Sequence, residues 1–273
     1  MVVVIVITGI VAGMVAVFIR LPVQGYVDAA RRAELTDIAD TAVRRVTRDL
    51  RLAVPNSARV SLVAGVYYLE FLQSKTGGFY RAACAVQPCP ATDHILDFNV
   101  PANNTGFDVL GGFPAAPAPQ PAVGDLIVVA NSYPGSGADA YAANNTATIA
   151  ALTPGVTPLI GLTPPVTFGY ESPGQNFQVI DSPVTYVCDP GAGGANGTGT
   201  LRRYWGYAIT AAQTTPPAGG TNALLATHVS GCLITSPENM PLPGYALVTF
   251  RLKLKAENEE VAFYHEAHIN NVP

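Results

Sequence analysis

Residues 1–19 read MVVVIVITGIVAGMVAVFI and contain no charged side chain. As a helix this stretch extends about 28 Å, close to the ~30 Å thickness of the hydrocarbon core of a bilayer. A cleaved secretory signal has an apolar core of only about 7–15 residues and ends in a small-residue cleavage site, whereas Arg20, Leu21 and Pro22 follow here. The stretch therefore predicts a retained membrane-spanning helix.

The helical pattern continues beyond the apolar stretch. Residues 23–52 contain no proline and alternate charged residues with an apolar series at helical spacing, namely Tyr26, Ala30, Leu35, Ile38, Ala42, Val46 and Leu50. Pro55 disfavours helix at the residue before it. We therefore expect one helix over residues 1–53, about 80 Å long, with a membrane-spanning part (1–19) and an amphipathic part (23–53). Pro22 and Gly25 predict a kink or local melting between the two parts.

After Pro55 the apolar pattern changes to alternation, which is typical of β-strands. Strand-like runs occupy residues 66–73, 79–82, 126–130, 177–180, 184–188 and 201–209. Residues 75–78 read Lys-Thr-Gly-Gly and predict a hairpin turn between the first two runs. The clearest pair is residues 246–255 and 261–269, joined by a turn at 257–259, where Val248, Phe250, Leu252 and Leu254 share one face.

Loops separate these strands. Residues 114–121 read PAAPAPQP and predict an extended linker, while residues 191–199 and 214–221 predict flexible surface loops. The strands on either side of the proline-rich segment are too few to fold alone. We therefore expect one β-rich unit over residues 54–273 and an α+β fold, with the amphipathic helix packed on an antiparallel sheet.

Composition limits the classes of partner and the compartment. Only 12% of the residues are charged, the formal net charge is −4 and the pI is near 5.5, so no basic surface for nucleic acid is expected. Arg20, Arg31 and Arg32 lie after the apolar stretch, and the positive-inside rule taken alone would leave the rest of the chain in the cytoplasm.

The cysteines indicate the opposite compartment. Cys84, Cys89, Cys188 and Cys232 lack the paired C-x₂₋₄-C spacing of zinc sites, so two disulfides in an oxidising compartment fit better. The natural pairing is Cys84 with Cys89 and Cys188 with Cys232. A basic leader that precedes Met1 would resolve the conflict between the two signals.

No residue pattern indicates catalysis, a cofactor or a metal site. His265 and His268 are three residues apart, and on a strand such residues point to opposite faces. The chain contains no G-x-S-x-G nucleophile elbow, and residues 191–197 miss the dinucleotide-binding pattern at Asn196. Asp37 and Asp40 lie at helical spacing from Arg44 and Arg45, which predicts ion pairs.

The N-terminal pattern resembles that of type IV pilins and type II secretion pseudopilins. A wider resemblance, over nearly the whole chain, is to the MshO family of minor pilins of the mannose-sensitive haemagglutinin (MSHA) pilus. The segments that carry it are 18–26 (FIRLPVQGY), 33–40 (AELTDIAD), 48–52 (RDLRL), 68–71 (YLEF), 107–111 (FDVLG), those around Cys188 and Cys232, and 268–273 (HINNVP). The resemblance implies a non-enzymatic inner-membrane protein with a single span, a periplasmic C-terminal domain and incorporation into a pilus.

Members of this family carry a leader that ends in Gly, followed by Phe-Thr-Leu-Ile-Glu and a Leu-Val-Val-Val run. Met1 stands at the position of that Leu. We therefore expect the leader, its cleavage by a prepilin peptidase and N-terminal methylation to involve sequence upstream of Met1, which the adjoining genomic DNA can test.

The resemblance further implies assembly with major and minor pilins and with the inner-membrane platform, so that the chain helps to initiate or cap a filament. Gly9 and Gly13 form a GxxxG pair that allows close helix packing in a membrane. Two other functions fit the pattern: a J-type pseudopilin of type II secretion, and a surface adhesin or binding module on a helical anchor.

Overall fold

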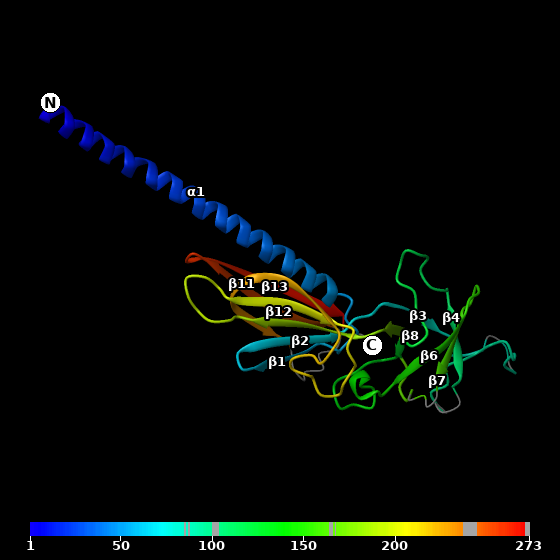
Figure 1. Cartoon of the computed structure of the whole chain (residues 1–273). Helices are drawn as coiled ribbons and strands as arrows, with labels where there is room; N and C mark the ends of the chain where they lie inside the picture. Colours follow the sequence, from blue (N-terminus) through cyan, green and yellow to red (C-terminus); the bar gives the residue numbers. More distant parts are fainter. Residues whose placement is uncertain are drawn as a thin grey trace.

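The computed structural model describes residues 1–84, 86, 88–99, 104–163, 166, 168–236 and 245–270. A long N-terminal helix leads into two β-rich parts that lie one after the other, a sheet and a closed barrel (Figure 1). The elements in order are α1 (Val2–Leu50), β1 (Arg59–Val63), β2 (Val66–Leu72), β3 (Thr76–Tyr80), β4 (Gly106–Leu110), β5 (Leu126–Val128), the 3₁₀ helix η2 (Ala140–Ala142), β6 (Thr146–Thr153), β7 (Leu159–Thr163), β8 (Asn176–Ile180), β9 (Pro183–Asp189), β10 (Gly199–Trp205), β11 (Thr221–Thr235), β12 (Tyr245–Ala256) and β13 (Glu259–Asn270). The α+β architecture expected from the sequence is confirmed.

Helix α1 is continuous from Val2 to Leu50, three residues shorter at its end than predicted. It passes through Pro22 and Gly25 without a break, and Figure 1 shows no sharp bend. The predicted local melting is therefore wrong, because the helix on either side of Pro22 is long enough to tolerate the loss of one backbone hydrogen bond.

The seven-stranded sheet is an antiparallel meander in the order β1-β2-β9-β10-β11-β12-β13. The second half of α1 lies on one face of it and contacts β11, β12 and β13. Strands β2 and β9 are direct neighbours, with Leu69 opposite Tyr186, although more than 100 residues separate them in the sequence. The remaining strands are therefore an insertion between two adjacent strands of this sheet.

The insertion is a closed barrel in the order β3-β4-β7-β6-β5-β8. Its core is separate from that of the sheet and contains the fully buried rings of Tyr80, Phe107, Phe168 and Phe177. A third, small cluster joins the two parts, with Val54 and Leu72 from the sheet side and Val128, Ala140, Tyr141 and Ile180 from the barrel side. The β-rich region thus contains two cores, with a shared apolar contact at the junction.

The C-terminal hairpin agrees with its predicted pattern. Strand β12 places Val248, Phe250, Leu252 and Leu254 in the core beneath α1, and β13 pairs with it along its whole length. Glu257 and Asn258 both have positive φ angles, as the two-residue turns of tight hairpins require.

The hairpin predicted around residues 75–78 is wrong. Strand β2 belongs to the sheet, whereas β3 belongs to the barrel and pairs with β4 and β8. Gly77 and Gly78 lie within β3, where the neighbouring strand approaches closely: a Cβ on Gly77 would lie 2.6 Å from the carbonyl oxygen of Phe177. These glycines therefore allow close strand packing rather than a turn.

Both expected disulfides are present, Cys84–Cys89 and Cys188–Cys232. The first closes a short loop after β3. The second joins β9 to β11, and Cys188 is fully buried in the core beneath α1.

Replacing Cys188 and Cys232 together with alanine is expected to destabilise the chain more than the same change at Cys84 and Cys89. Loop entropy alone gives about 4 kcal/mol for the 44-residue separation and about 2 kcal/mol for the five-residue separation. Thermal and denaturant unfolding of both full-length double variants measures the difference. An equal loss in the two variants would contradict this ranking.

Candidate functional site: a free apolar helix and its anchor

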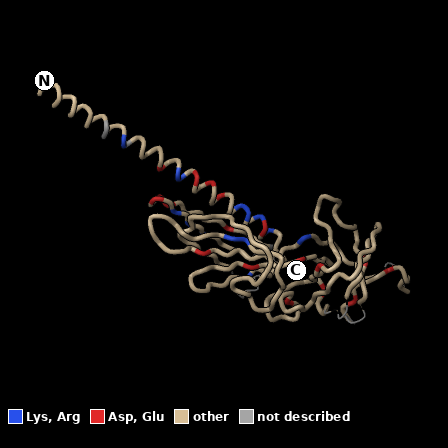
Figure 2. Tube along the Cα trace, in the orientation of Figure 1, with Lys and Arg blue, Asp and Glu red and all other residues tan. Residues whose placement is uncertain are grey.

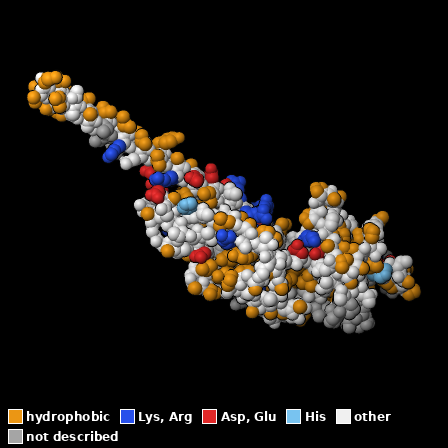
Figure 3. Space-filling model, in the orientation of Figure 1, with side chains coloured by type: hydrophobic (Ala, Val, Ile, Leu, Met, Phe, Trp, Pro, Cys, Tyr) orange, Lys and Arg blue, Asp and Glu red, His pale blue; other side chains and the backbone are white. Residues whose placement is uncertain are grey.

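The N-terminal part of α1 extends away from the rest of the molecule (Figure 3). Large apolar side chains there are exposed, including Val2, Val3, Val4, Ile5, Val6, Ile7, Ile10, Val11, Met14, Val15, Phe18, Ile19, Val23, Tyr26 and Val27. The helix is long and apolar enough to cross a membrane, and none of its most apolar 18-residue window is buried. A soluble protein rarely exposes so continuous an apolar surface, which marks it as a contact surface for lipid or protein.

Thr8, Gly9 and Gly13 are polar or small residues within the exposed apolar half of α1, and each is compatible with an apolar environment. The Thr8 hydroxyl donates to the carbonyl oxygens of Val4 and Ile5 at 2.8 and 3.0 Å, so the helix itself satisfies this hydroxyl. Gly9 and Gly13 lie four residues apart on one face. Apart from the adjoining residues and the helix's own backbone, no described atom lies within 4 Å of the position that a Cβ would take on either. The predicted GxxxG surface is therefore open in this chain.

The second half of α1 is anchored by an apolar stripe. Leu35, Ala39, Ala42, Val43, Val46 and Leu50 are buried against the sheet, at the spacing of one helix face. Contact begins near Leu35, because Tyr26 is 77% exposed and Ala30 is also exposed. The apolar series read from the sequence therefore divides into a free part and a packed part. Burying a leucine or valine contributes about 1.5–3 kcal/mol, so this stripe is the main source of the anchor.

A buried carboxylate adds a polar contact to the anchor. Asp49 faces the sheet from α1, where its Oδ2 accepts hydrogen bonds from Arg203 Nε at 2.7 Å and from the Tyr186 hydroxyl at 2.8 Å. Arg203 also donates to Gln73 Oε1 at 2.9 Å, and its guanidinium lies 4.9 Å from the centre of the Trp205 ring. This cluster therefore ties α1 to β9, β10 and the end of β2.

Tyr186 is held neutral in this cluster. Burial raises the pKa of its hydroxyl, and the charge of Asp49 and the hydrogen bond to it raise it further. Burial likewise raises the pKa of Tyr207, with a further contribution from the charge of Glu70. Both tyrosines are thus favoured as hydrogen-bond donors in the folded state.

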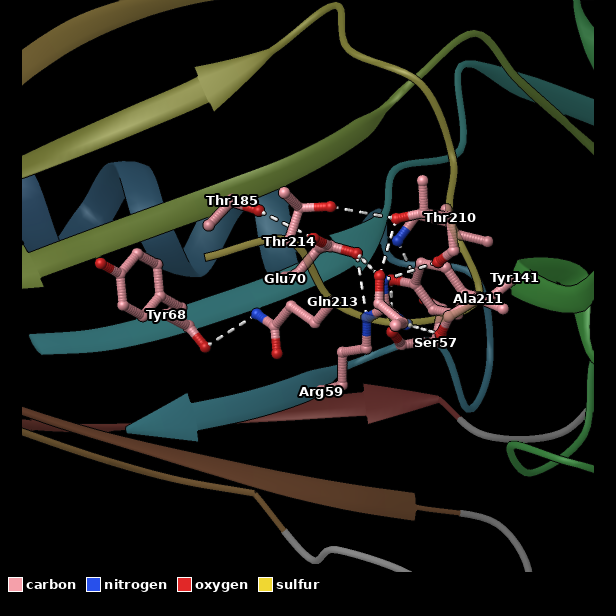
Figure 4. A network of polar contacts seen from close by, with 12 residues as sticks. Ser57, Arg59, Tyr68, Glu70, Tyr141, Thr185, Thr210, Ala211, Gln213 and Thr214 are labelled. Atoms are coloured by element: carbon pink, nitrogen blue, oxygen red, sulfur yellow. Dashed lines mark hydrogen bonds and ion pairs between the residues drawn. The ribbon is translucent and has the colours of Figure 1, made fainter. Parts of the chain in front are cut away.

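A second buried carboxylate, Glu70 of β2, lies where the sheet meets the barrel (Figure 4). Its Oε1 accepts from Arg59 Nε at 2.9 Å, and its Oε2 accepts from the Thr185 hydroxyl at 3.2 Å. The Arg59 guanidinium also lies 3.7 Å from the centre of the Tyr141 ring, which belongs to η2 of the inserted barrel. The Tyr141 hydroxyl donates back to the Ser57 carbonyl at 2.9 Å. The network links the barrel to the first strands of the sheet.

The charged residues singled out in the sequence are placed as follows. Arg44 Nε donates to Asp40 at 2.7 Å, which confirms that ion pair, whereas Arg45 contacts Asp49 at 3.3 Å instead of Asp37 or Asp40. On β13, His265 lies on the half-buried face and His268 on the exposed face, as predicted. Among the described residues no group of three or more His, Cys, Asp or Glu side chains could hold a metal ion.

Sequence reasoning missed Asp49, Arg203 and Glu70. Asp49 had a detectable signal, because helical periodicity places it on the same face as Val46 and Leu50, where a charge needs a partner. Glu70 likewise interrupts the apolar run of β2. Arg45 and Arg48 are local partners of Asp49, and Arg59 is a local partner of Glu70. Arg203, Tyr186 and Thr185 are more than 100 residues away from the carboxylates they contact, and only the fold brings them together.

Comparison with protein-family models, with curated proteins and with solved structures gives no significant match for this chain. The chain's own residues supply the functional signal, which is an exposed apolar half-helix continuous with a half-helix that is anchored by the apolar stripe from Leu35 to Leu50 and by Asp49.

Arg203→Met is expected to destabilise the chain by about 3–5 kcal/mol, because it leaves the Asp49 carboxylate buried without its main cation. Asp49→Leu combined with Arg203→Met is expected to cost less than Arg203→Met alone, since both charges are then removed. Arg202→Met is the control, because Arg202 is the neighbouring residue on β10 and its side chain bonds Asn222 at the surface. Denaturant unfolding measures all three, and equal losses at Arg202 and Arg203 would refute the role of the pair.

The buried tyrosines predict alkaline destabilisation. Since their pKa is higher in the folded state than the usual value of about 10, the stability they contribute is complete below pH 10 and is lost as the pH rises above it. Each tyrosine contributes a slope of up to about 1.4 kcal/mol per pH unit in the free energy of unfolding. Tyr186→Phe and Tyr207→Phe should each reduce this slope, measured by urea unfolding between pH 9 and 11, while Tyr133→Phe at an exposed ring should leave it unchanged.

Proposed function

We propose that this chain is a membrane-anchored minor pilin or pseudopilin that works by assembly rather than by catalysis. The observation that carries the proposal is the continuity of α1: one helix has an exposed apolar half and an anchored amphipathic half. Any contact made by the apolar half is therefore transmitted directly to the sheet and the barrel.

The physical basis of assembly is exchange of neighbours. In a bilayer the apolar side chains of residues 1–19 contact lipid, and in a bundle they contact other apolar helices, so the exchange changes the hydrophobic free energy little. Close packing must then supply the specificity. The open face at Gly9 and Gly13 is suited to this, because a missing side chain lets two backbones approach.

The resemblance to MshO-type minor pilins supports an MSHA-type pilus as the assembly. The two disulfides support a periplasmic or extracellular location for residues 54–273, since such bonds persist in oxidising compartments. In this proposal the chain resides in the inner membrane with one span, meets the other pilins through α1 and enters the filament to help initiate or cap it.

Gly9→Leu combined with Gly13→Leu is expected to reduce co-purification of other pilins with the tagged chain by tenfold or more, because the leucines separate the helix backbones. Membrane insertion should persist, since both substitutions increase hydrophobicity. Val3→Leu with Ile7→Leu, at the same four-residue spacing, is the matched control and should leave the yield unchanged.

Mass spectrometry of proteins that co-purify from membranes provides the readout. Pilins recovered by the parent chain and lost with the glycine variant support the proposal. Recovery of type II secretion pseudopilins would instead assign the chain to that system, and recovery of no pilin-like protein would refute assembly.

A further inference from the structure

The groove between α1 and β13 is distinct from the apolar half-helix. It has a volume of about 410 Å³ and is lined by Arg44, Arg48 and Arg51 on one side and by Phe263, Tyr264 and His265 on the other. The three β13 residues are consecutive, and consecutive side chains of a strand point to opposite faces. The groove therefore opens on the backbone edge of β13 rather than on a face of the sheet.

That edge is unoccupied in the part of the chain that the structure describes. Strand β13 is the last strand of the sheet and pairs only with β12, over twelve residues. Such a long edge presents a row of backbone donors and acceptors that can pair with another extended segment. Its acidic side chains at the near end are already paired, Glu259 with Arg32 and Glu260 with Lys253.

The opposite wall of the groove carries an excess of positive charge. Figure 2 shows acidic positions followed by basic ones along the anchored half of α1. The side chains of Arg44 and Arg48 are 79% and 65% exposed, and the structure gives Arg51 no carboxylate partner among the described residues. Among the described residues, Asp40, which pairs with Arg44, is the only acidic residue that lines the groove. Arg48 lies 3.8 Å from Asp49, whose charge is shared with Arg45 and Arg203. The cations thus outnumber the carboxylates at the groove, which leaves net positive charge for an acidic ligand.

The spacing of Arg44 and Arg48 is close to that of alternate residues in an extended chain, and Arg51 continues the same helix face at a shorter spacing. Arg44 and Arg48 are separated by about 6 Å along the helix, and Arg48 and Arg51 by about 4.5 Å. Alternate residues of a strand are separated by about 6.6 Å and point to the same face. Carboxylates at every second position of an added strand could therefore reach successive arginines. The acidic side chains of Glu260 and Glu266 lie on the other, exposed face of β13, so they do not face these arginines.

Membrane lipid does not fit this site. With residues 1–19 in a bilayer, Arg44 lies about 37 Å beyond the end of the span. That distance is several times the Debye length of about 8 Å at physiological ionic strength. A polypeptide, unlike lipid, can reach these arginines and can also pair with the backbone edge of β13.

We propose that this groove binds an acidic, extended segment of a partner protein, which adds to the sheet beside β13 with acidic residues at alternate positions. Backbone hydrogen bonds to β13 supply pairing, and Arg44, Arg48 and Arg51 select the charge. The binding does not require the apolar half of α1, so it stands apart from assembly through that helix.

The test uses the full-length chain in detergent and an octapeptide of alternating Glu and Thr that carries a central benzophenone for photo-crosslinking. The expected result is crosslinking to residues 259–270. Arg44→Gln, Arg48→Gln and Arg51→Gln together should lower the yield at least tenfold. Methylation of alternate peptide nitrogens should lower it to a similar extent, because it removes the donors that pair with β13. Arg251→Gln, at an exposed arginine of β12, is the matched control and should have no effect.

A peptide of alternating Lys and Thr should fail to crosslink at this site. The proposal is overturned if the acidic peptide gives no crosslink, if its crosslinks map elsewhere, or if the arginine substitutions or the methylation leave the yield unchanged. It is also overturned if the chain crosslinks to a second copy of itself through β13 and the peptide does not compete. Circular dichroism of each variant establishes that its fold is retained.

Discussion

The contact between the second half of α1 and the seven-stranded sheet is the constraint on which the rest of the structure depends. Leu35 to Leu50 supply the apolar stripe, and β11 to β13 supply the complementary surface. Because α1 is a single helix, fixing its second half also fixes the direction of its first half. The exposed apolar segment is therefore a continuous helical extension of the packed half of α1.

The seven-stranded sheet accommodates a large insertion because the insertion replaces only one of the connections between its strands. Every strand of the meander pairs with its neighbour in the sequence, apart from β2 and β9, where the barrel replaces a hairpin loop. The barrel has its own aromatic core and does not supply strands to the sheet. Its position is set by two short connections, the shared cluster around Leu72 and Ile180, and the polar network of Glu70, Arg59 and Tyr141.

Each of the two junctions, helix to sheet and sheet to barrel, contains a buried carboxylate that accepts several hydrogen bonds. Asp49 lies between α1 and the sheet, and Glu70 lies between the sheet and the barrel. Apolar surface alone would allow the parts to shift relative to one another, whereas a buried charge is stable only where its donors are correctly placed. In this chain the two carboxylates thus favour one arrangement of helix, sheet and barrel.

The sequence alone determined the elements whose signal is local: the uncharged run of residues 1–19, the helical spacing up to Leu50 and the alternation in the C-terminal hairpin. It predicted the natural pairing of the four cysteines, but four cysteines allow three connectivities and the structure decided among them. The sequence also placed His265 and His268 on opposite faces, because strand geometry requires it. Only the tertiary structure decided that Gly77 and Gly78 belong to a barrel strand, that β2 pairs with β9, and that Asp49 meets Arg203. These features depend on segments far apart in the chain, and the spacing of neighbouring residues carries no information about which distant backbone or charge will approach them.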